Sequence, residues 1–303
     1  LLSAMGDLCG FRHDDLGKPT AAGMFNNPIC GSGTGIDIAW GKPDVVARVG
    51  WPGWVDKQWG SVSQDGGKTW TAFKTQPKKG KGAGNVAVTA DGSTVLYAPK
   101  NGEVVFSKDQ GATWTPCEGL PEVEETADWA PAYLRIAADR VNPKKVYVLD
   151  AKGGQAFYSE DGGARFTASS SGLPNMADYE FSSSSAVAVP GIEGDVWLTT
   201  GKELNHSTDS GKSYETVDSV SAAHHIGLGK AMEGKQYPAM FLIGKVGYVE
   251  GFFRSDDAAR TWVRINDDKH NWGFCNVIIG DPRVPGRVYI GTGGRGIIYG
   301  DPK

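Results

Sequence analysis

The sequence predicts an all-β protein, a seven-bladed β-propeller that forms a single domain over residues 1–303. A returning turn motif, its regular spacing and short strands on either side of it predict this fold. The motif is Ser-x-Asp-x-Gly-x-Thr-Trp or a close variant, and its Asp residues are 44, 52, 48 and 48 residues apart, at Asp65, Asp109, Asp161, Asp209 and Asp257. A repeat of about 40–50 residues with four short strands per unit is typical of propeller blades.

The residue types of the motif suit a tight turn between two strands. Ser and Asp side chains bond to nearby backbone amides, and glycine adopts positive φ without steric cost. The aromatic residue at the end of each copy is expected to pack between neighbouring sheets, which makes Trp70, Trp114 and Trp262 core residues. Degenerate copies at residues 11–15 and 297–301 bring the number of units to seven.

A second marker, a turn followed by a strand, recurs inside the units. It is clear at residues 42–46, 142–147 and 285–289, and weaker at 92–95 and 194–197. Each unit therefore reads as an inner strand, a turn, a second strand, a glycine-rich link, a third strand, the Ser-x-Asp motif and an outer strand. Alternation such as Val-Tyr-Val-Leu at 146–149 fits half-buried antiparallel strands.

The first and last units are predicted to be incomplete. Residues 1–5 align with the second strand of the last unit at 288–292, so the first unit has no inner strand and the last has no outer strand. Folded β-proteins avoid open sheet edges. We therefore expect residues that precede Leu1, or another chain, to complete the ring.

Composition excludes several classes of partner. The formal charge of −4 and the pI near 5.8 predict no nucleic-acid partner. No apolar run approaches the roughly 20 residues that span a bilayer, so no membrane partner is expected. The chain opens on Leu1-Leu2-Ser3 with no visible signal peptide.

Four cysteines, Cys9, Cys30, Cys117 and Cys275, are too few for a disulfide framework in a chain of 303 residues. Their spacing matches no zinc pattern, and neither a metal nor a cofactor is predicted. Free thiols and one disulfide remain alternatives. If a bond forms, Cys9 with Cys275 is the expected pair, because both lie in glycine-rich loops of adjoining blades.

One acidic residue stands where another blade has a glycine. When Gly10 is aligned with Gly296, Asp7 falls opposite Gly293, in the link between second and third strands. Such links face one end of a propeller, where binding loops are common. Asp7 is therefore either a catalytic carboxylate or a side chain that caps its own turn, and the residues leave both roles open.

Several motifs together resemble glycoside hydrolase family 74. They are SAMGDLCGFRHD at 3–14, TGID at 34–37, the Ser-x-Asp turns, DRVNP at 139–143 and the run from GDPRV at 280–284 to GD at 300–301. The resemblance extends from Leu1 to Pro302. The turns alone are less specific, because sialidases and sortilin-like propellers share them.

The resemblance implies half of a secreted enzyme that hydrolyses the β-1,4-glucan backbone of xyloglucan with inversion. Two seven-bladed propellers face each other across an open cleft, and this chain corresponds to the carboxy-terminal one. Asp7 matches the catalytic Asp of that lobe and is expected to be the general acid. The base is expected from the amino-terminal lobe, so the isolated chain is predicted to be nearly inert.

A neutral glucan is recognised by aromatic platforms and hydrogen bonds. Aromatic residues in irregular loops are the candidates for substrate binding, with packing of the loop itself as the alternative: Trp51, Trp54, Trp129, Tyr133 and Trp272. His270 is predicted near Asp7 if the ring is complete, either orienting substrate or as a structural histidine. Asp37 is predicted to be a buried structural carboxylate.

Two other functions fit parts of this pattern. A non-catalytic glycan-binding propeller would keep the aromatic loops but would not need Asp7. A sialidase would share the turns, but its chemistry wants an arginine cluster and a tyrosine nucleophile, and no such set stands out in the sequence.

Overall fold

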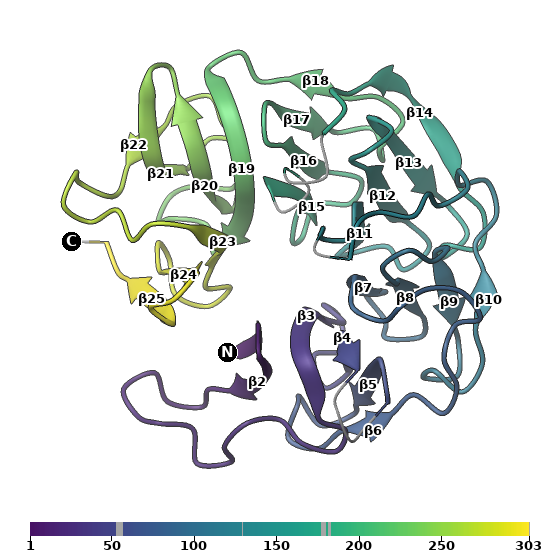
Figure 1. Cartoon of the computed structure of the whole chain (residues 1–303). Coiled ribbons are helices and arrows are strands. Elements are labelled where there is room, and N and C mark those ends of the chain that lie inside the picture. The colour runs from purple at the N-terminus through teal and green to yellow at the C-terminus, as the bar shows by residue number, and fades with distance from the viewer. Residues whose placement is uncertain (53–56, 129, 177–179, 181–182, 303) are drawn as a thin grey trace. The chain divides into compact units, whose positions relative to one another are not determined.

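The computed structural model describes residues 1–52, 57–128, 130–176, 180 and 183–302. These residues form antiparallel β-sheets and contain no α-helix (Figure 1). The chain divides into two compact units, residues 1–150 with 156–168, and residues 151–155 with 169–303.

The first unit holds a two-stranded sheet and two four-stranded sheets. Their strands are β1 (Leu2–Met5) and β2 (Leu8–Arg12); β3 (Cys30–Ile38), β4 (Val46–Pro52), β5 (Gly60–Ser63) and β6 (Thr71–Ala72); and β7 (Asn85–Val88), β8 (Val95–Ala98), β9 (Val105–Ser107) and β10 (Thr115–Pro116). The boundary between the units falls within the next four-stranded sheet, which consists of β11 (Leu134–Ala138), β12 (Val146–Asp150), β13 (Gln155–Ser159) and β14 (Thr167–Gly172).

The second unit holds two four-stranded sheets and one three-stranded sheet. Their strands are β15 (Ser184–Ala188), β16 (Val196–Thr200), β17 (Leu204–Ser207) and β18 (Glu215–Thr216); β19 (Val220–Gly229), β20 (Ala239–Val246), β21 (Val249–Ser255) and β22 (Val263–Arg264); and β23 (Cys275–Gly280), β24 (Val288–Thr292) and β25 (Ile297–Gly300).

The sheets confirm the all-β propeller fold and correct the number of blades. In the described part of the chain, six sheets have three or four strands in sequential order, as blades do, and β1–β2 has two. The described part of the chain thus forms six blades rather than seven, with the first and last units incomplete as predicted. Among the described residues, the two incomplete sheets are β1–β2, which has no inner strand beside β1, and β23–β25, which has no outer strand beside β25. The motif count marks third strands only, so it counts both sheets.

The repeated turn is built as its residue types predict. The Ser63 hydroxyl donates to Asp65 Oδ1 (2.8 Å) and accepts from the Gly67 amide (2.8 Å). The other carboxylate oxygen of Asp65 accepts from the Thr69 hydroxyl (2.6 Å), and Trp70 then enters the core. The same serine–aspartate hydrogen bond recurs at 2.8–2.9 Å in the remaining four copies, at Asp109, Asp161, Asp209 and Asp257.

These hydrogen bonds stabilise the ionised carboxylates. Bonds from the Thr113 hydroxyl and amide lower the pKa of Asp109 to about 2, and bonds from Thr69 lower the pKa of Asp65 well below its usual range. Burial opposes the shift at Asp161, Asp209 and Asp257, but the hydrogen bonds of the turn still lower each pKa.

Acid is therefore expected to destabilise the sheets through these turns. A lowered pKa in the folded state contributes stability above the unfolded value near 4, and this contribution is lost as the pH falls toward about 2. The melting temperature should vary little between pH 7 and 5 and fall steeply between pH 4 and 2. The Asp109→Asn variant should melt lower at pH 7 and lose less on acidification. An equal loss in variant and parent would contradict this mechanism.

Side chains join the inner strands of the first unit. The Thr34 hydroxyl on β3 donates to the Gly84 carbonyl (3.0 Å) just before β7, and the Ile136 amide on β11 donates to Asn85 Oδ1 on β7 (2.9 Å). Cores of aliphatic and aromatic side chains fill the space between the sheets of each unit. One in the first unit includes Phe73 and Tyr97, and one in the second includes Trp197.

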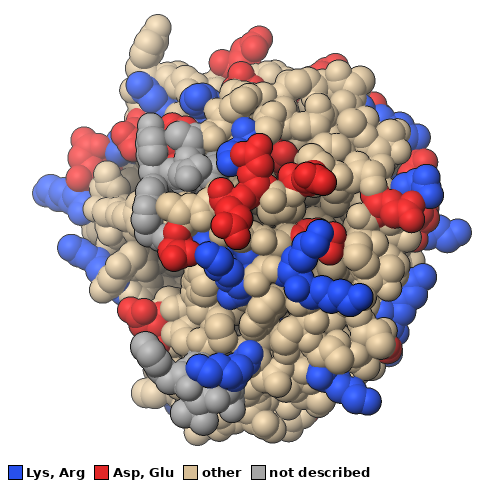
Figure 2. Space-filling model, turned by 45° about the vertical axis from the view of Figure 1, so that its right-hand side comes forward, with Lys and Arg blue, Asp and Glu red and all other residues tan. Residues whose placement is uncertain are grey.

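The surface has mixed charge. On the face shown in Figure 2, acidic and basic side chains are interspersed among uncharged ones. None of the described residues belongs to a helix long and apolar enough to span a membrane.

Candidate functional site

Each blade has two chemically different ends. Because successive strands are antiparallel, the links from second to third strand and from outer strand to the next inner strand lie at one end. The Ser-x-Asp turns lie at the other, between third and outer strands. Asp7, Tyr133 and Trp272 belong to links of the first kind in their own sheets, and Trp51 lies at the end of β4 that leads into such a link.

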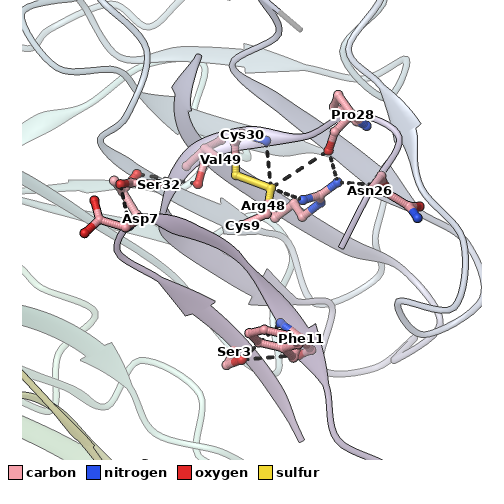
Figure 3. The surroundings of a disulfide bond; sticks show 11 residues. Ser3, Asp7, Cys9, Phe11, Asn26, Pro28, Cys30, Ser32, Arg48 and Val49 are labelled. Carbon is pink, nitrogen blue, oxygen red and sulfur yellow. Dashed lines mark hydrogen bonds between the residues drawn. A yellow bond between two sulfur atoms is a disulfide. The ribbon is translucent and has the colours of Figure 1, made fainter. Parts of the chain in front are cut away.

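Asp7 lies in the two-residue link between β1 and β2, where Met5 pairs with Leu8. Its side chain is exposed and its φ is 58°, in the left-handed region. Its amide donates to the Ser32 hydroxyl on β3 (2.8 Å). Figure 3 shows the Asp7 carboxylate directed away from Ser32 and from the neighbouring disulfide. The carboxylate is thus available to a ligand rather than used to cap its own turn.

Trp51 and Asp7 have a common neighbour, Ser32. It is half-buried on β4 and directly opposite Ser32 on β3. Residues opposite each other in antiparallel strands project from the same face. Ser32 thus contacts the backbone of Asp7 and pairs with Trp51, so the structure brings two of the predicted site residues to one region.

Of the next three predicted aromatic residues, one lies among the described residues. Trp54 and Trp129 lie outside the described residues. Tyr133 is only 5% exposed. Its hydroxyl accepts from the Glu124 amide (2.9 Å), and burial raises the pKa of Tyr133 to about 12. Tyr133 therefore stabilises the loop before β11 through Glu124. This is the alternative to substrate binding given above, in which the aromatic residue packs its own loop.

His270 and Trp272 lie together in the link between β22 and β23. The Trp272 ring stacks on Phe252 of β21, with centroids 5.5 Å apart and an interplanar angle of 13°. The His270 ring is tilted on Trp272, and its Nδ1 lies 2.6 Å from Asp267 Oδ1. Trp272 is half-buried and His270 is exposed. They belong to the second unit, whereas Asp7 belongs to the first.

An aromatic residue that the sequence pattern did not single out is the most exposed large apolar side chain among the described residues. Tyr248 is 97% exposed in the two-residue link between β20 and β21. The Ser221 hydroxyl donates to the Gly247 carbonyl (2.7 Å) and fastens this link to β19. The first three of the four strands of this sheet are ten, eight and seven residues long.

The predicted cysteine pair is wrong. Cys9 on β2 is bonded to Cys30 on β3, and Cys275 is a free buried thiol. Cys9 and Cys30 meet because β2 and β3 are neighbours in the first unit. Cys117 is also free.

The predicted structural role of Asp37 is confirmed. Its carboxylate pairs with the Arg140 guanidinium (2.9 Å) and accepts from the Val88 amide (2.8 Å). Among the described residues, no cluster of His, Cys, Asp and Glu could hold a metal ion. The chemistry available in the region of Ser32 is therefore that of one exposed carboxylate, Asp7, and one half-buried aromatic side chain, Trp51.

Several known proteins are similar in sequence to this chain. The family model of the BNR/Asp-box repeat matches residues 61–72. The chain is 39% identical over 312 residues to a xyloglucanase of Paenibacillus sp. and covers 29% of it. It is 42% identical over 305 residues to xyloglucanase Xgh74A of Acetivibrio thermocellus and covers 34% of it. Both matches include the whole of this chain, which spans about a third of the length of these relatives.

A solved structure is similar to the same extent. The crystal structure of the GH74 xyloglucanase from Xanthomonas campestris matches 100% of this chain with 37% identity and a TM-score of 0.89, and the chain covers 41% of it. These matches confirm the resemblance to glycoside hydrolase family 74.

Proposed function

We propose that this chain is the carboxy-terminal propeller of a family 74 glycoside hydrolase that cleaves the β-1,4-glucan backbone of xyloglucan. Its similarity along the whole chain to xyloglucanases carries the substrate class. The exposed carboxylate of Asp7, beside Ser32 and Trp51, supports a catalytic role at this end of the first unit. Because the chain spans about a third of these relatives, the complete activity belongs to the full-length protein.

In this proposal Asp7 is the general acid of an inverting hydrolysis. It protonates the departing glycosidic oxygen, while a carboxylate about 6.5–9.5 Å away activates water on the opposite face of the sugar. The second carboxylate belongs to the amino-terminal propeller. A general acid also needs an environment that favours its protonated form, such as burial or a neighbouring negative charge. Asp7 is exposed in this chain, so the opposing lobe and the substrate would supply that environment.

The finer prediction of seven blades belongs to the same proposal. β1 and β2 would be the second and third strands of a seventh blade, whose inner strand lies outside the 303 residues. The bridge between Phe11 on β2 and Met24 supports this reading, because it occupies the place of an outer strand. We also propose that the enzyme is secreted, which the Cys9–Cys30 disulfide supports, since such bonds persist in oxidising compartments.

A substrate panel tests the proposed function. The full-length protein should release oligosaccharides from xyloglucan and act poorly on cellulose and not at all on a sialoside, and NMR should show the anomeric configuration inverted in the first product. Binding of xyloglucan without release of products would favour the non-catalytic glycan-binding propeller. Cleavage of the sialoside would overturn the assignment.

Replacing Trp51 by Ala is expected to weaken substrate binding. A half-buried indole on the face that carries Ser32 can stack on a sugar ring, and aromatic anchors commonly contribute about 1.4 kcal/mol or more, which is tenfold in affinity. The KM for xyloglucan oligosaccharides should rise about tenfold in the full-length enzyme.

Trp40 is the matched control for Trp51. It is 39% exposed and follows β3, at the opposite end of the same sheet. Trp40→Ala should leave the KM unchanged. Equal effects of the two substitutions on the KM, or none from Trp51→Ala, would remove Trp51 from the binding site.

A further inference from the structure

The link that carries Asp7 has a conformation that needs support. Asp7 is a non-glycine residue at φ 58°, where the left-handed backbone costs about 1–2 kcal/mol per residue. It is also one of only two residues between the paired Met5 and Leu8. Exposed links of this kind are mobile unless other parts of the structure hold them. The direction of the Asp7 carboxylate therefore depends on what fixes the backbone of Asp7.

Two attachments join this link to β3. The Asp7 amide donates to the Ser32 hydroxyl (2.8 Å), and the disulfide joins Cys9, two residues after Asp7, to Cys30, two residues before Ser32. Figure 3 shows the disulfide beside the Asp7–Ser32 contact. One attachment would leave the link free to rotate about it. Two attachments to β3, one at Asp7 itself and one at Cys9, fix both its position and its orientation.

The backbones at this contact are close. A Cβ on Gly33 of β3 would lie 2.3 Å from the Cys9 carbonyl oxygen, so β2 approaches β3 directly at this point. A side chain at residue 33 would push Cys9 away and with it Asp7, two residues earlier. The approach that allows the disulfide also brings Asp7 within hydrogen-bonding distance of Ser32.

The disulfide is itself held from the side opposite Asp7. Arg48 is 4% exposed, and its guanidinium nitrogens donate to Cys9 Sγ (2.7 Å) and to the Pro28 carbonyl (2.7 Å). The guanidinium carbon lies 5.1 Å from the ring centroid of Phe25 and 4.6 Å from that of Trp70. A buried guanidinium between two aromatic rings is a rigid support. The attachment thus continues from Asp7 through Cys9 into the core around Trp70, at the end of a Ser-x-Asp turn.

We infer that Ser32 and the Cys9–Cys30 disulfide are positioning residues that hold the Asp7 carboxylate in its reactive direction. This inference rests on the proposed catalytic role of Asp7. Ser32 acts through the backbone of Asp7 and does not touch the reacting atoms. The expected consequence of losing it is a carboxylate that is present and ionisable but misdirected, and small misplacements of a catalytic group cost large factors in rate.

The full-length enzyme tests this with Ser32→Ala, Ser32→Thr and the double variant Cys9→Ser/Cys30→Ser. Ser32→Ala should lower kcat on xyloglucan oligosaccharides about tenfold with KM within about twofold, because direction affects the chemical step more than binding. Ser32→Thr keeps the hydroxyl and should restore most of kcat. The double cysteine variant should lower kcat in the same manner and should also lower the melting temperature.

A substrate with an activated leaving group separates positioning from general damage. A nitrophenyl glycoside of the oligosaccharide needs little protonation on departure, so the loss of kcat in Ser32→Ala should shrink to about twofold with it. Ser93→Ala is the control, because it removes an exposed serine hydroxyl that also makes a turn hydrogen bond, to Asp91 (2.8 Å) between β7 and β8, and it should leave both rates unchanged.

The outcomes distinguish this inference from the proposed function. A parental kcat in Ser32→Ala, or an equal loss on both substrates, overturns the positioning role even if Asp7→Asn is inactive. Full activity of Asp7→Asn overturns the catalytic role of Asp7, and the inference falls with it. If Ser32→Ala melts at a lower temperature than the parent, the Ser32→Thr variant separates stability from positioning. A Ser32→Thr variant that regains the parental melting temperature but not the parental kcat also counts against the positioning role.

Discussion

Replacement of Asp7 by Asn in the full-length enzyme is expected to lower kcat on xyloglucan by about 10²–10⁴-fold, the usual contribution of a general acid. The amide has nearly the same shape as the carboxyl group but cannot give a proton to the departing oxygen. Because the Asp7 side chain is exposed and its backbone supplies the bond to Ser32, the substitution should disturb neither the turn nor the melting temperature. Steady-state rates and calorimetry measure the two effects.

The leaving group identifies which role Asp7 has. If Asp7 is the acid, Asp7→Asn should recover much of its rate on a nitrophenyl glycoside, whereas a missing base would not be compensated in this way. Asp14→Asn is a suitable control, because Asp14 is an exposed carboxylate that pairs with Arg12 (2.7 Å) beyond the other end of β2. A kcat near that of the parent in Asp7→Asn, or equal losses in both variants, would favour the glycan-binding alternative.

The fold was predictable because the hydrogen bonds of its repeated turns join residues that are close in the sequence. Each Ser-x-Asp turn makes its hydrogen bonds within about seven residues. The sequence around Ser63 and Asp65 therefore predicts a turn between two strands even when no distant contact is known. The number of blades was less predictable, because a motif count registers third strands alone. That the first unit lacks an inner strand followed only from the alignment of residues 1–5 with 288–292, and this unit is the two-stranded sheet β1–β2 in the structure.

The site was predictable in part. Asp7 stood out because another blade has glycine at the equivalent position, but the partner of its amide did not, since Ser32 is 25 residues away on another sheet. The cysteine pairing failed for the same reason. Glycine-rich surroundings suggested Cys275, whereas the approach of β2 to β3 at Gly33 decides for Cys30. Contacts between blades depend on strand stagger, which no local pattern encodes.

Some aromatic residues in irregular loops are buried and others are exposed, and composition does not show which. Tyr133 faces inward and bonds Glu124, while Tyr248 extends fully into solvent from a fastened hairpin. Both lie in links at the same end of their own sheets. The difference arises because the Tyr133 hydroxyl is held by Glu124 of its own loop, whereas Tyr248 lies in a two-residue link between strands that pair up to Val246 and Val249.

Replacement of Asp37 by Ala is expected to have a large effect on stability. Its carboxylate joins three successive inner strands of the first unit: it lies on β3, accepts from Val88 on β7 and pairs with Arg140 just after β11. The side chains of Asp37 and Arg140 are 13% and 16% exposed. Removing one partner of a largely buried pair leaves the other charge uncompensated, which costs about 3 kcal/mol of unfolding free energy. The transition of this propeller in calorimetry should move to a clearly lower temperature.

A double-mutant cycle separates the ion pair from its surroundings. If the loss comes from an uncompensated guanidinium, Asp37→Ala with Arg140→Ala should be less destabilising than the sum of the two single substitutions, because the double variant buries no unpaired charge. Asp15→Ala is the matched control: Asp15 pairs with Lys18 at 3.3 Å on the surface, where such a pair contributes about 0–1 kcal/mol. Additive single effects, or equal losses from Asp37→Ala and Asp15→Ala, would show that the pair does not join the three strands.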